Sequence, residues 1–163
     1  MRNNPFKFLA HGLFAALFFS FLPAISMAEG DKPEAMTSEA KVISMIGTAE
    51  VMPSGETEWK LLAENALLHE GDKMRTGKDS KALVETQGNK KTATLTVRKE
   101  TEFSFKVFHH DEAAKTENTV LDLESGSLLI EAEKIAPDSH FQVKTPTSVV
   151  DAHEAKFEVN VSK

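Results

Sequence analysis

The sequence predicts an all-β domain: a compact two-sheet sandwich or β-roll of about ten short strands, preceded by an N-terminal signal-peptide helix. Two observations lead to this prediction. From Val42 onward, apolar and polar residues alternate in short runs, as expected of strands with one buried and one solvated face. Glycine or proline stands between most of these runs, at the spacing that separates strands in sandwiches and barrels.

An export signal is predicted over residues 1–28. A basic start is followed by an almost wholly apolar run from Leu9 to Leu22, and the small residues Ser26 and Ala28 stand at the end. This order is typical of a secretory signal peptide. An uncleaved membrane anchor is the alternative, although polar residues and a proline interrupt the apolar run. In either case we expect the remaining chain to be periplasmic or secreted.

The charge and the cysteine count narrow the classes of partner. Removing residues 1–28 takes away Arg2 and Lys7 and no acidic residue, so the net charge changes from −6 to −8. Negative charge argues against nucleic acid as a partner, and we expect membrane contact only if the signal segment is uncleaved. Because the chain has no cysteine, it has no disulfide framework and no thiol chemistry.

Behind the signal, residues 29–41 are polar and predict a flexible leader, and residues 42–163 predict the β domain. A clear strand pattern in this domain places Phe103, Phe105 and Val107 on one face. Similar alternation occurs at residues 92–97, 121–124, 141–144 and 157–161.

Two segments could instead form short helices. Lys60–His69 has good helix propensity, and Asp111–Glu117 could form one turn. Neither segment is long enough to change the predicted fold class.

Five short pieces stand in a characteristic order between residues 42 and 161. They are Gly47 to Val84 with its Gly71-Asp72-Lys73-Met74-Arg75-Thr76-Gly77 core, Gly88 to Thr101, Leu121 to Leu128, Phe141 to Pro146, and Phe157 to Val159. Together they resemble the periplasmic domain of the FecR family. The best-known members of that family are inner-membrane regulators that sense an outer-membrane transporter and bind a sigma factor through a cytoplasmic segment. About eight residues precede the apolar segment here, so the resemblance implies an exported, stand-alone FecR domain without the anti-sigma arm.

The resemblance has one departure. His153-Glu154-Ala155 replaces a step that is usually arginine-glycine-threonine in the family. If that glycine has a positive φ, Glu154 is strained or the turn is rebuilt. Asn65 also stands near a common glycine position, and asparagine tolerates left-handed backbone better than most residues.

The resemblance singles out several positions as family-motif or interaction residues. For Asp72 and Thr76 a structural role in turns is expected, and a charged ligand site of Asp72 and Arg75 is the alternative. Trp59 is expected in the core beside two leucines, whereas an exposed Trp59 would indicate a sugar-stacking or partner surface. The full set is Trp59, Gly71, Asp72, Arg75, Thr76, Gly77, Thr145, Pro146 and Phe157.

No pattern in the sequence predicts catalysis, a metal or a cofactor. His109-His110-Asp111-Glu112 has metal-binding chemistry, but consecutive residues rarely converge on one ion, so we expect a solvated hairpin tip. There is no serine nucleophile elbow, HExxH motif or phosphate-binding glycine loop. Cysteine and tyrosine are absent. The chain is therefore expected not to be an enzyme, and a metal-dependent enzyme is the least favoured hypothesis.

The function predicted is that of an exported, non-catalytic binding or regulatory module that contacts another envelope protein. A sheet edge is the expected docking place, and Val149 to Val161 is the candidate edge. The alternative is a carbohydrate-binding protein of the cell envelope. That alternative requires exposed aromatic residues along a groove, and only Trp59 and five phenylalanines follow residue 28.

Overall fold

The computed structural model describes residues 36–87, 91–111, 113–132, 138–152 and 156–162, and the statements below concern these residues. The predicted signal peptide at residues 1–28 and the family departure at 153–155 lie outside the described ranges, as does Glu112. Within those ranges no helix is long and apolar enough to cross a membrane.

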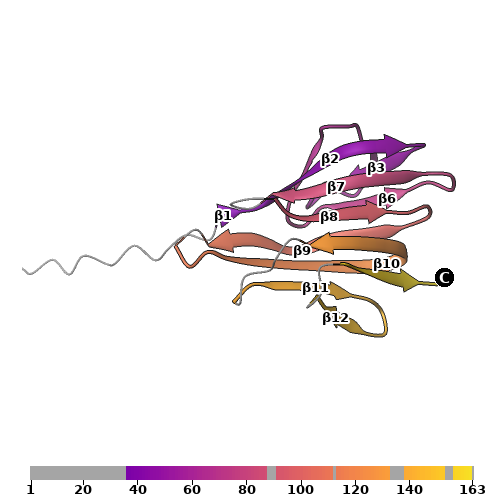
Figure 1. Cartoon of the computed structure of the whole chain (residues 1–163). Coiled ribbons are helices and arrows are strands. Elements are labelled where there is room, and N and C mark those ends of the chain that lie inside the picture. Colours follow the sequence, from indigo (N-terminus) through magenta and orange to yellow (C-terminus); the bar gives the residue numbers. More distant parts are fainter. Residues whose placement is uncertain (1–35, 88–90, 112, 133–137, 153–155, 163) are drawn as a thin grey trace, which may run out of the picture. The chain divides into compact units, whose positions relative to one another are not determined.

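The described chain consists of strands and turns, which confirms the all-β prediction (Figure 1). The strands are β1 (Met36–Thr37), β2 (Glu39–Ile46), β3 (Ala49–Met52), β4 (Lys60–Leu61), β5 (Leu67–Leu68), β6 (Lys73–Thr76), β7 (Lys81–Gln87), β8 (Lys91–Val97), β9 (Glu102–Asp111), β10 (Thr116–Ala132), β11 (His140–Lys144), β12 (Val149–Asp151) and β13 (Lys156–Val161).

Three local expectations differ from the structure. The sheet begins before residue 42, because Ala40 is fully buried and pairs with Leu68 on β5 and with Thr86 on β7. The segment that could have been helical at 60–69 contains β4 and β5, and Asn65 between them has a positive φ of 65° that ends regular structure. Asp111 and residues 113–117 form the end of the β9–β10 hairpin in place of a helical turn.

The strands form one continuous curled sheet, and β10 belongs to both of its halves. In the first half the order is β4-β3-β6-β9-β10-β11-β12, with β1 added to the end of β9; in the second it is β5-β2-β7-β8-β10-β13. Every pairing is antiparallel except that of β10 with β11. Because β10 joins the halves by hydrogen bonds, a sandwich of two separate sheets is not confirmed.

A bend at Gly126 lets β10 serve both halves. Residues up to Ser125 pair with β9, and residues from Gly126 onward pair with β13. Gly126 has a φ of 89°, and a Cβ there would lie 2.4 Å from the Cα of Thr101. The hydroxyl oxygen of Thr101 accepts a hydrogen bond from the N–H of Ser127 at 2.9 Å, so the bend is fixed on both sides.

The core lies inside the curl, where apolar side chains of both halves meet. Phe103, Phe105 and Phe108 of β9 form its aromatic part, with ring centroids 5.3 Å apart in the first pair and 5.0 Å apart in the second. The predicted inward position of Val107 is wrong: a β-bulge pairs Val107 with Val120 but Phe105 with Leu121, which turns Phe108 inward instead.

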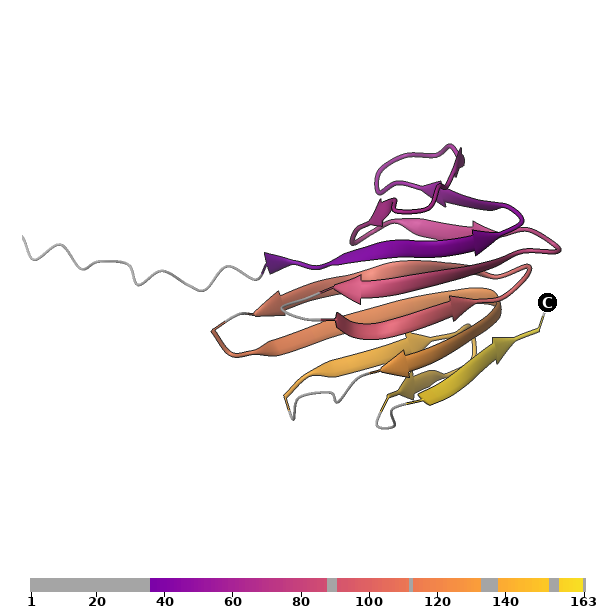
Figure 2. The ribbon, with the colours of Figure 1, turned by 45° about the horizontal axis from the view of Figure 1, so that its top comes forward.

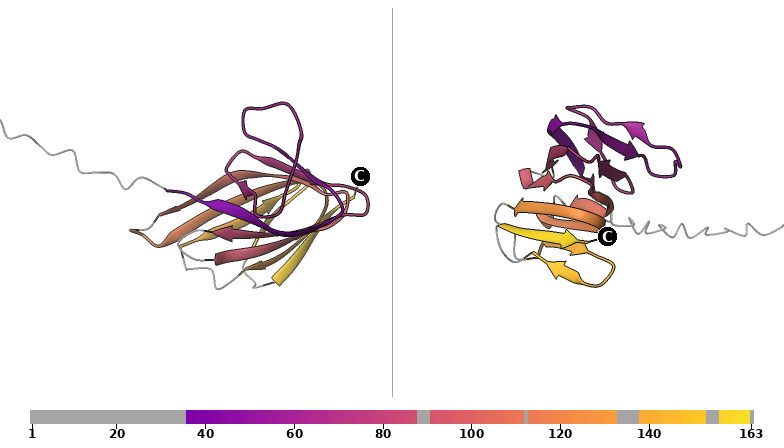
Figure 3. Two further views of the ribbon diagram at one scale, coloured as in Figure 1. Left: turned by 90° about the horizontal axis from the view of Figure 1, so that it is seen from above. Right: turned by 90° about the vertical axis from the view of Figure 1, so that its right-hand side faces the viewer.

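One end of the curl is closed and the other is open. The segment 62–66 bonds to both halves, because Leu62 donates its N–H to Ala49 on β3 and Val42 on β2 donates to Ala66. At the opposite end, β12 pairs only with β11, and β13 pairs only with β10. In Figures 2 and 3 the indigo strands of the closed end and the yellow strands of the open end lie at opposite sides of the sheet.

Candidate functional site

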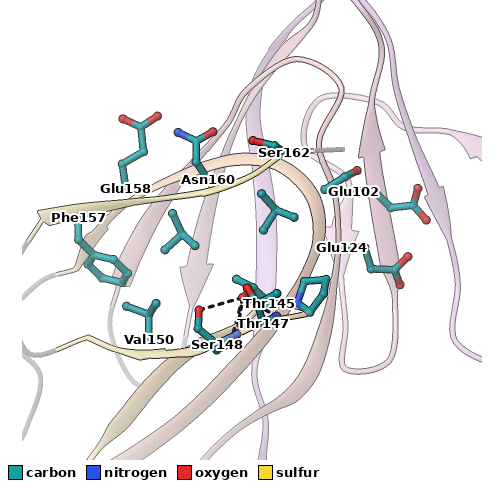
Figure 4. A pocket seen from close by; sticks show the side chains of 14 residues that line it. Glu102, Glu124, Thr145, Thr147, Ser148, Val150, Phe157, Glu158, Asn160 and Ser162 are labelled. Carbon is teal, nitrogen blue, oxygen red and sulfur yellow. Dashed lines mark hydrogen bonds between the residues drawn. The ribbon is translucent and has the colours of Figure 1, made fainter.

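A groove of about 670 Å³ runs between β12 and β13 at the open end of the curl (Figure 4). β13 forms one wall from Phe157 to Val161, and the other wall is Val150 with the turn at residues 145–148. Glu102, Glu124 and Ser125 close one end. Within the predicted edge segment from Val149 to Val161, the strands β12 and β13 each pair with a single described strand and so have a free edge.

The floor of the groove is apolar. Val150, Phe157 and Val161 are partly buried and pack against the core, and Val159 is 7% exposed. Figure 4 shows Glu158 and Asn160 on the other face of β13, as the alternation of a strand requires. β13 therefore presents one apolar face to the groove at a spacing of two residues.

The pairing of β10 determines which backbone groups of β13 are free. The carbonyl of Ser127 accepts the N–H of Arg98 at 3.1 Å, on the β8 side of β10. In an antiparallel sheet, successive residues direct their backbone groups to alternate neighbours, so Leu128 faces β13 and its partner Val159. It follows that the N–H and C=O groups of Glu158 and Asn160 point outward at the free edge.

The turn that forms the other wall is held by its own hydrogen bonds. Thr145 donates its N–H to the carbonyl of Ser148 at 2.8 Å, and the hydroxyl oxygen of Thr145 accepts the N–H of Ser148 at 3.0 Å. Pro146 and Thr147 at its tip are exposed. The predicted residues Thr145, Pro146 and Phe157 are thus brought together in the groove.

Among the described residues that line the groove, every charged side chain is a glutamate. Glu124 binds the Nζ of Lys73 at 2.9 Å, and this hydrogen bond raises the pKa of Lys73, to which the charges of Glu102 and Asp122 add. Glu102 itself makes no ion pair with a described residue. Arg75 lies opposite Glu102 on β6, but its guanidinium binds Glu50, so among the described residues Glu102 is left without an ion pair of its own.

Glu158 lies on the outer face of β13 and is stabilised as a carboxylate. It accepts a hydrogen bond from the hydroxyl of Ser127 at 2.7 Å and lies 3.0 Å from the Nε of Arg98. The Ser127 hydrogen bond, with the Arg98 charge, lowers the pKa of Glu158. Its carboxylate therefore stabilises the fold above the usual value of 4.5, and that contribution is lost as the pH falls through the lowered pKa.

We expect Ser127→Ala to raise the pKa of Glu158 toward 4.5, because the substitution removes the largest cause of the shift. The measurement is an NMR titration of the Glu158 side-chain carboxyl in both proteins. Ser148→Ala, on the other wall of the groove, is the control and should leave that pKa unchanged. An unchanged pKa in Ser127→Ala would contradict the hydrogen bond.

Polar groups of the motif from Gly71 to Gly77 form hydrogen bonds with the backbone of neighbouring turns. Gly71 turns with a φ of 89°, where a Cβ would lie 2.3 Å from the hydroxyl oxygen of Ser54. The buried carboxylate of Asp72 accepts the N–H groups of Ser54 and His69, each at 2.9 Å. Both of its oxygens are therefore bonded to the backbone of neighbouring turns.

Thr76 and Gly77 complete this motif from the next turn. The hydroxyl of Thr76 donates to the carbonyl of Arg98 and accepts the N–H of Thr101 at 3.1 Å. Gly77 donates its N–H to Thr48 at 2.9 Å. These bonds join the end of β6 and the residue after it to the turns before β3 and β9, away from the floor of the groove.

The expectation that Trp59 lies in the core is wrong. Trp59 is partly exposed, and the guanidinium carbon of Arg75 lies 4.1 Å from its ring centroid. Arg75 in turn binds Glu50 at 2.6 Å, so it does not form a charged site with Asp72. β4 is a two-residue strand at the sheet's rim, where Leu61 is 79% exposed and only the following Leu62 is buried. The cation–π contact covers one face of the indole.

The expected solvated hairpin tip lies just past the histidine pair, at residues 113–115, which are exposed. His109 and His110 lie within β9, and β1 pairs alongside them. His110 is buried, with its Nδ1 3.1 Å from the hydroxyl oxygen of Ser38. Because successive residues of a strand point to opposite faces, the side chains of His109 and His110 point away from each other. No group of three or more potential metal ligands occurs in the part of the chain that the structure describes.

Sequence reasoning missed the acidic end of the groove. Glu102 and Glu124 are distant in sequence and meet because Ser125 pairs with Glu102 at the end of the β9–β10 ladder. No local pattern marks this meeting. The apolar wall of β13, in contrast, is visible in the alternation of residues 157–161.

The curled β-sheet and its open edge define a small all-β domain with a groove between two edge strands. The family model described as FecR protein matches residues 72–163, more than half of the chain, and the chain belongs to this family. The match confirms the resemblance read from the sequence and includes all the strands around the groove. FecR-family proteins are typically associated with the cell envelope. The comparisons with curated proteins and with solved structures gave no match.

Proposed function

We propose that this chain is an exported, non-catalytic regulatory module of the cell envelope that binds an extended segment of another envelope protein. The observation that carries the proposal is the free edge of β13 beside an apolar groove. Membership in the FecR family supports a sensory or regulatory role in the envelope. Strand addition to a sheet edge is a common way of binding extended segments.

The groove offers both components of such binding. The outward N–H and C=O groups of Glu158 and Asn160 supply hydrogen bonds to a partner strand, and the floor receives its alternate side chains. Fully burying one apolar side chain contributes about 1.5–3 kcal/mol, while association costs several kcal/mol in lost freedom. Two or three buried side chains therefore support reversible binding, which suits a regulatory contact.

The carbohydrate alternative has less support from the groove. Sugar-binding sites use exposed aromatic faces. Phe157 is the single aromatic residue among the described residues that line this groove, and it is partly buried against the core. Trp59 lies at the rim near the closed end, and Arg75 covers one face of its ring. We therefore favour a protein ligand.

Site-directed photo-crosslinking in cells tests this proposal. We expect a photoreactive amino acid at Asn160 to give a discrete protein adduct, and the same group at Leu61, which is exposed at the closed end, to give none. An adduct that disappears after digestion of peptidoglycan, or equal adducts at both positions, would contradict a protein partner in the groove. Enzymatic turnover by the purified protein would contradict the non-catalytic role.

A further inference from the structure

We propose that the groove between β12 and β13 selects an extended peptide segment with alternating apolar residues and a lysine or arginine beside them. The inference rests on the proposed function and specifies its ligand. It depends on the spacing of the apolar floor and on the charge at the end of the groove.

The floor sets the apolar spacing. Phe157, Val159 and Val161 stand at every second position of β13 and face the groove. A strand that pairs with β13 shares its pleat, so its own alternate side chains lie on the same face. The ligand therefore needs apolar residues at every second position, and its intervening side chains face solvent with Glu158 and Asn160.

The end of the groove sets the charge. The ammonium group of Lys73 binds Glu124 and also interacts electrostatically with Glu102 and Asp122. One positive charge therefore stands among three carboxylates. Lys106 lies 3.8 Å from Asp122 and compensates that residue, which leaves Glu102 in excess. A cationic side chain from the ligand would balance Glu102, and a carboxylate would be repelled.

The same charges argue against a second copy of this chain as the occupant. Two grooves brought together would place two acidic ends, each with Glu102 and Glu124, near one another. The whole chain has a net charge of −6, so repulsion opposes this contact at a distance as well. A basic segment of a different protein meets neither obstacle.

The test uses three peptides with one core of alternating valine and threonine, flanked at both ends by two lysines, two serines or two glutamates. Fluorescence anisotropy at low salt measures their binding to the protein without residues 1–28 and, in parallel, to the full chain. We expect the lysine peptide to bind at least threefold more tightly than the serine peptide and the glutamate peptide to bind most weakly. Added salt should reduce the difference, since these charges are solvent-exposed.

Glu102→Gln should reduce the preference for the lysine peptide over the serine peptide, because it removes the carboxylate that has no ion pair among the described residues while Glu124 remains. Glu117→Gln is the matched control, because it removes the same charge about 23 Å away along β10 from Glu124. Equal binding of the three peptides by the unaltered protein would overturn the charge selection and leave the proposed function standing. No binding of any peptide, or a protein that self-associates through the groove in sedimentation, would overturn both.

Discussion

Gly126→Ala is expected to destabilise the protein by about 3–5 kcal/mol. A left-handed backbone costs a non-glycine residue about 1–2 kcal/mol. In addition, the new Cβ would lie 2.4 Å from the Cα of Thr101 and 2.7 Å from the carbonyl oxygen of Glu100. These contacts are with backbone, so relief requires β10 and the turn before β9 to separate.

The matched control is Gly55→Ala. Gly55 has a φ of 79°, close to that of Gly126, but no atom lies within 4 Å of its added Cβ. Gly55→Ala should therefore lower the free energy of unfolding only by the cost of a left-handed backbone, about 1–2 kcal/mol. Urea denaturation of both variants measures the difference, which isolates the steric term at the bend. Equal destabilisation of the two variants would show that the close packing of Gly126 on Thr101 does not contribute.

The bend at Gly126 is an example of a feature that residue alternation in the sequence does not predict. Alternation within short runs predicted the all-β class and the inward residues of several strands, because each strand records its two faces locally. The same pattern placed Val107 on the wrong face. One extra residue in a β-bulge reverses which face the following side chains point to, and the residue types alone do not reveal the bulge. Nor does the alternation reveal that one long strand serves both halves of the sheet, which depends on Gly126 packing on a residue 25 positions earlier.

The groove was predictable in part for the same reason. Its free edge was expected between Val149 and Val161, where the alternation is local. Its acidic end depends on the pairing of β9 with β10, and the surface position of Trp59 depends on how short β4 is. Both features depend on how strands that are distant in the sequence pair with one another, and no short stretch of the sequence reveals that pairing.

Asn160→Pro is expected to weaken peptide binding at the groove by at least tenfold while leaving the fold intact. Proline removes the N–H of residue 160, which points outward from β13, and its ring occupies the space that a partner strand needs. No hydrogen bond to β10 is lost, since the groups that face β10 belong to Phe157, Val159 and Val161. Binding is measured with the lysine-flanked peptide, and thermal unfolding confirms that the domain remains folded.

Two further variants distinguish binding through the backbone of β13 from binding through the Asn160 side chain and from a general loss of stability. Asn160→Ala keeps the N–H and removes only the side chain, so binding should stay within about twofold if the backbone carries the contact. Val159→Pro removes an N–H that faces β10 and should lower the unfolding temperature, because an interior ladder bond is lost. If Asn160→Pro bound the peptide normally, or if Asn160→Ala lost as much affinity, strand pairing at this edge would be wrong. The outward backbone groups of β13 are thus the structural feature on which binding in this groove depends.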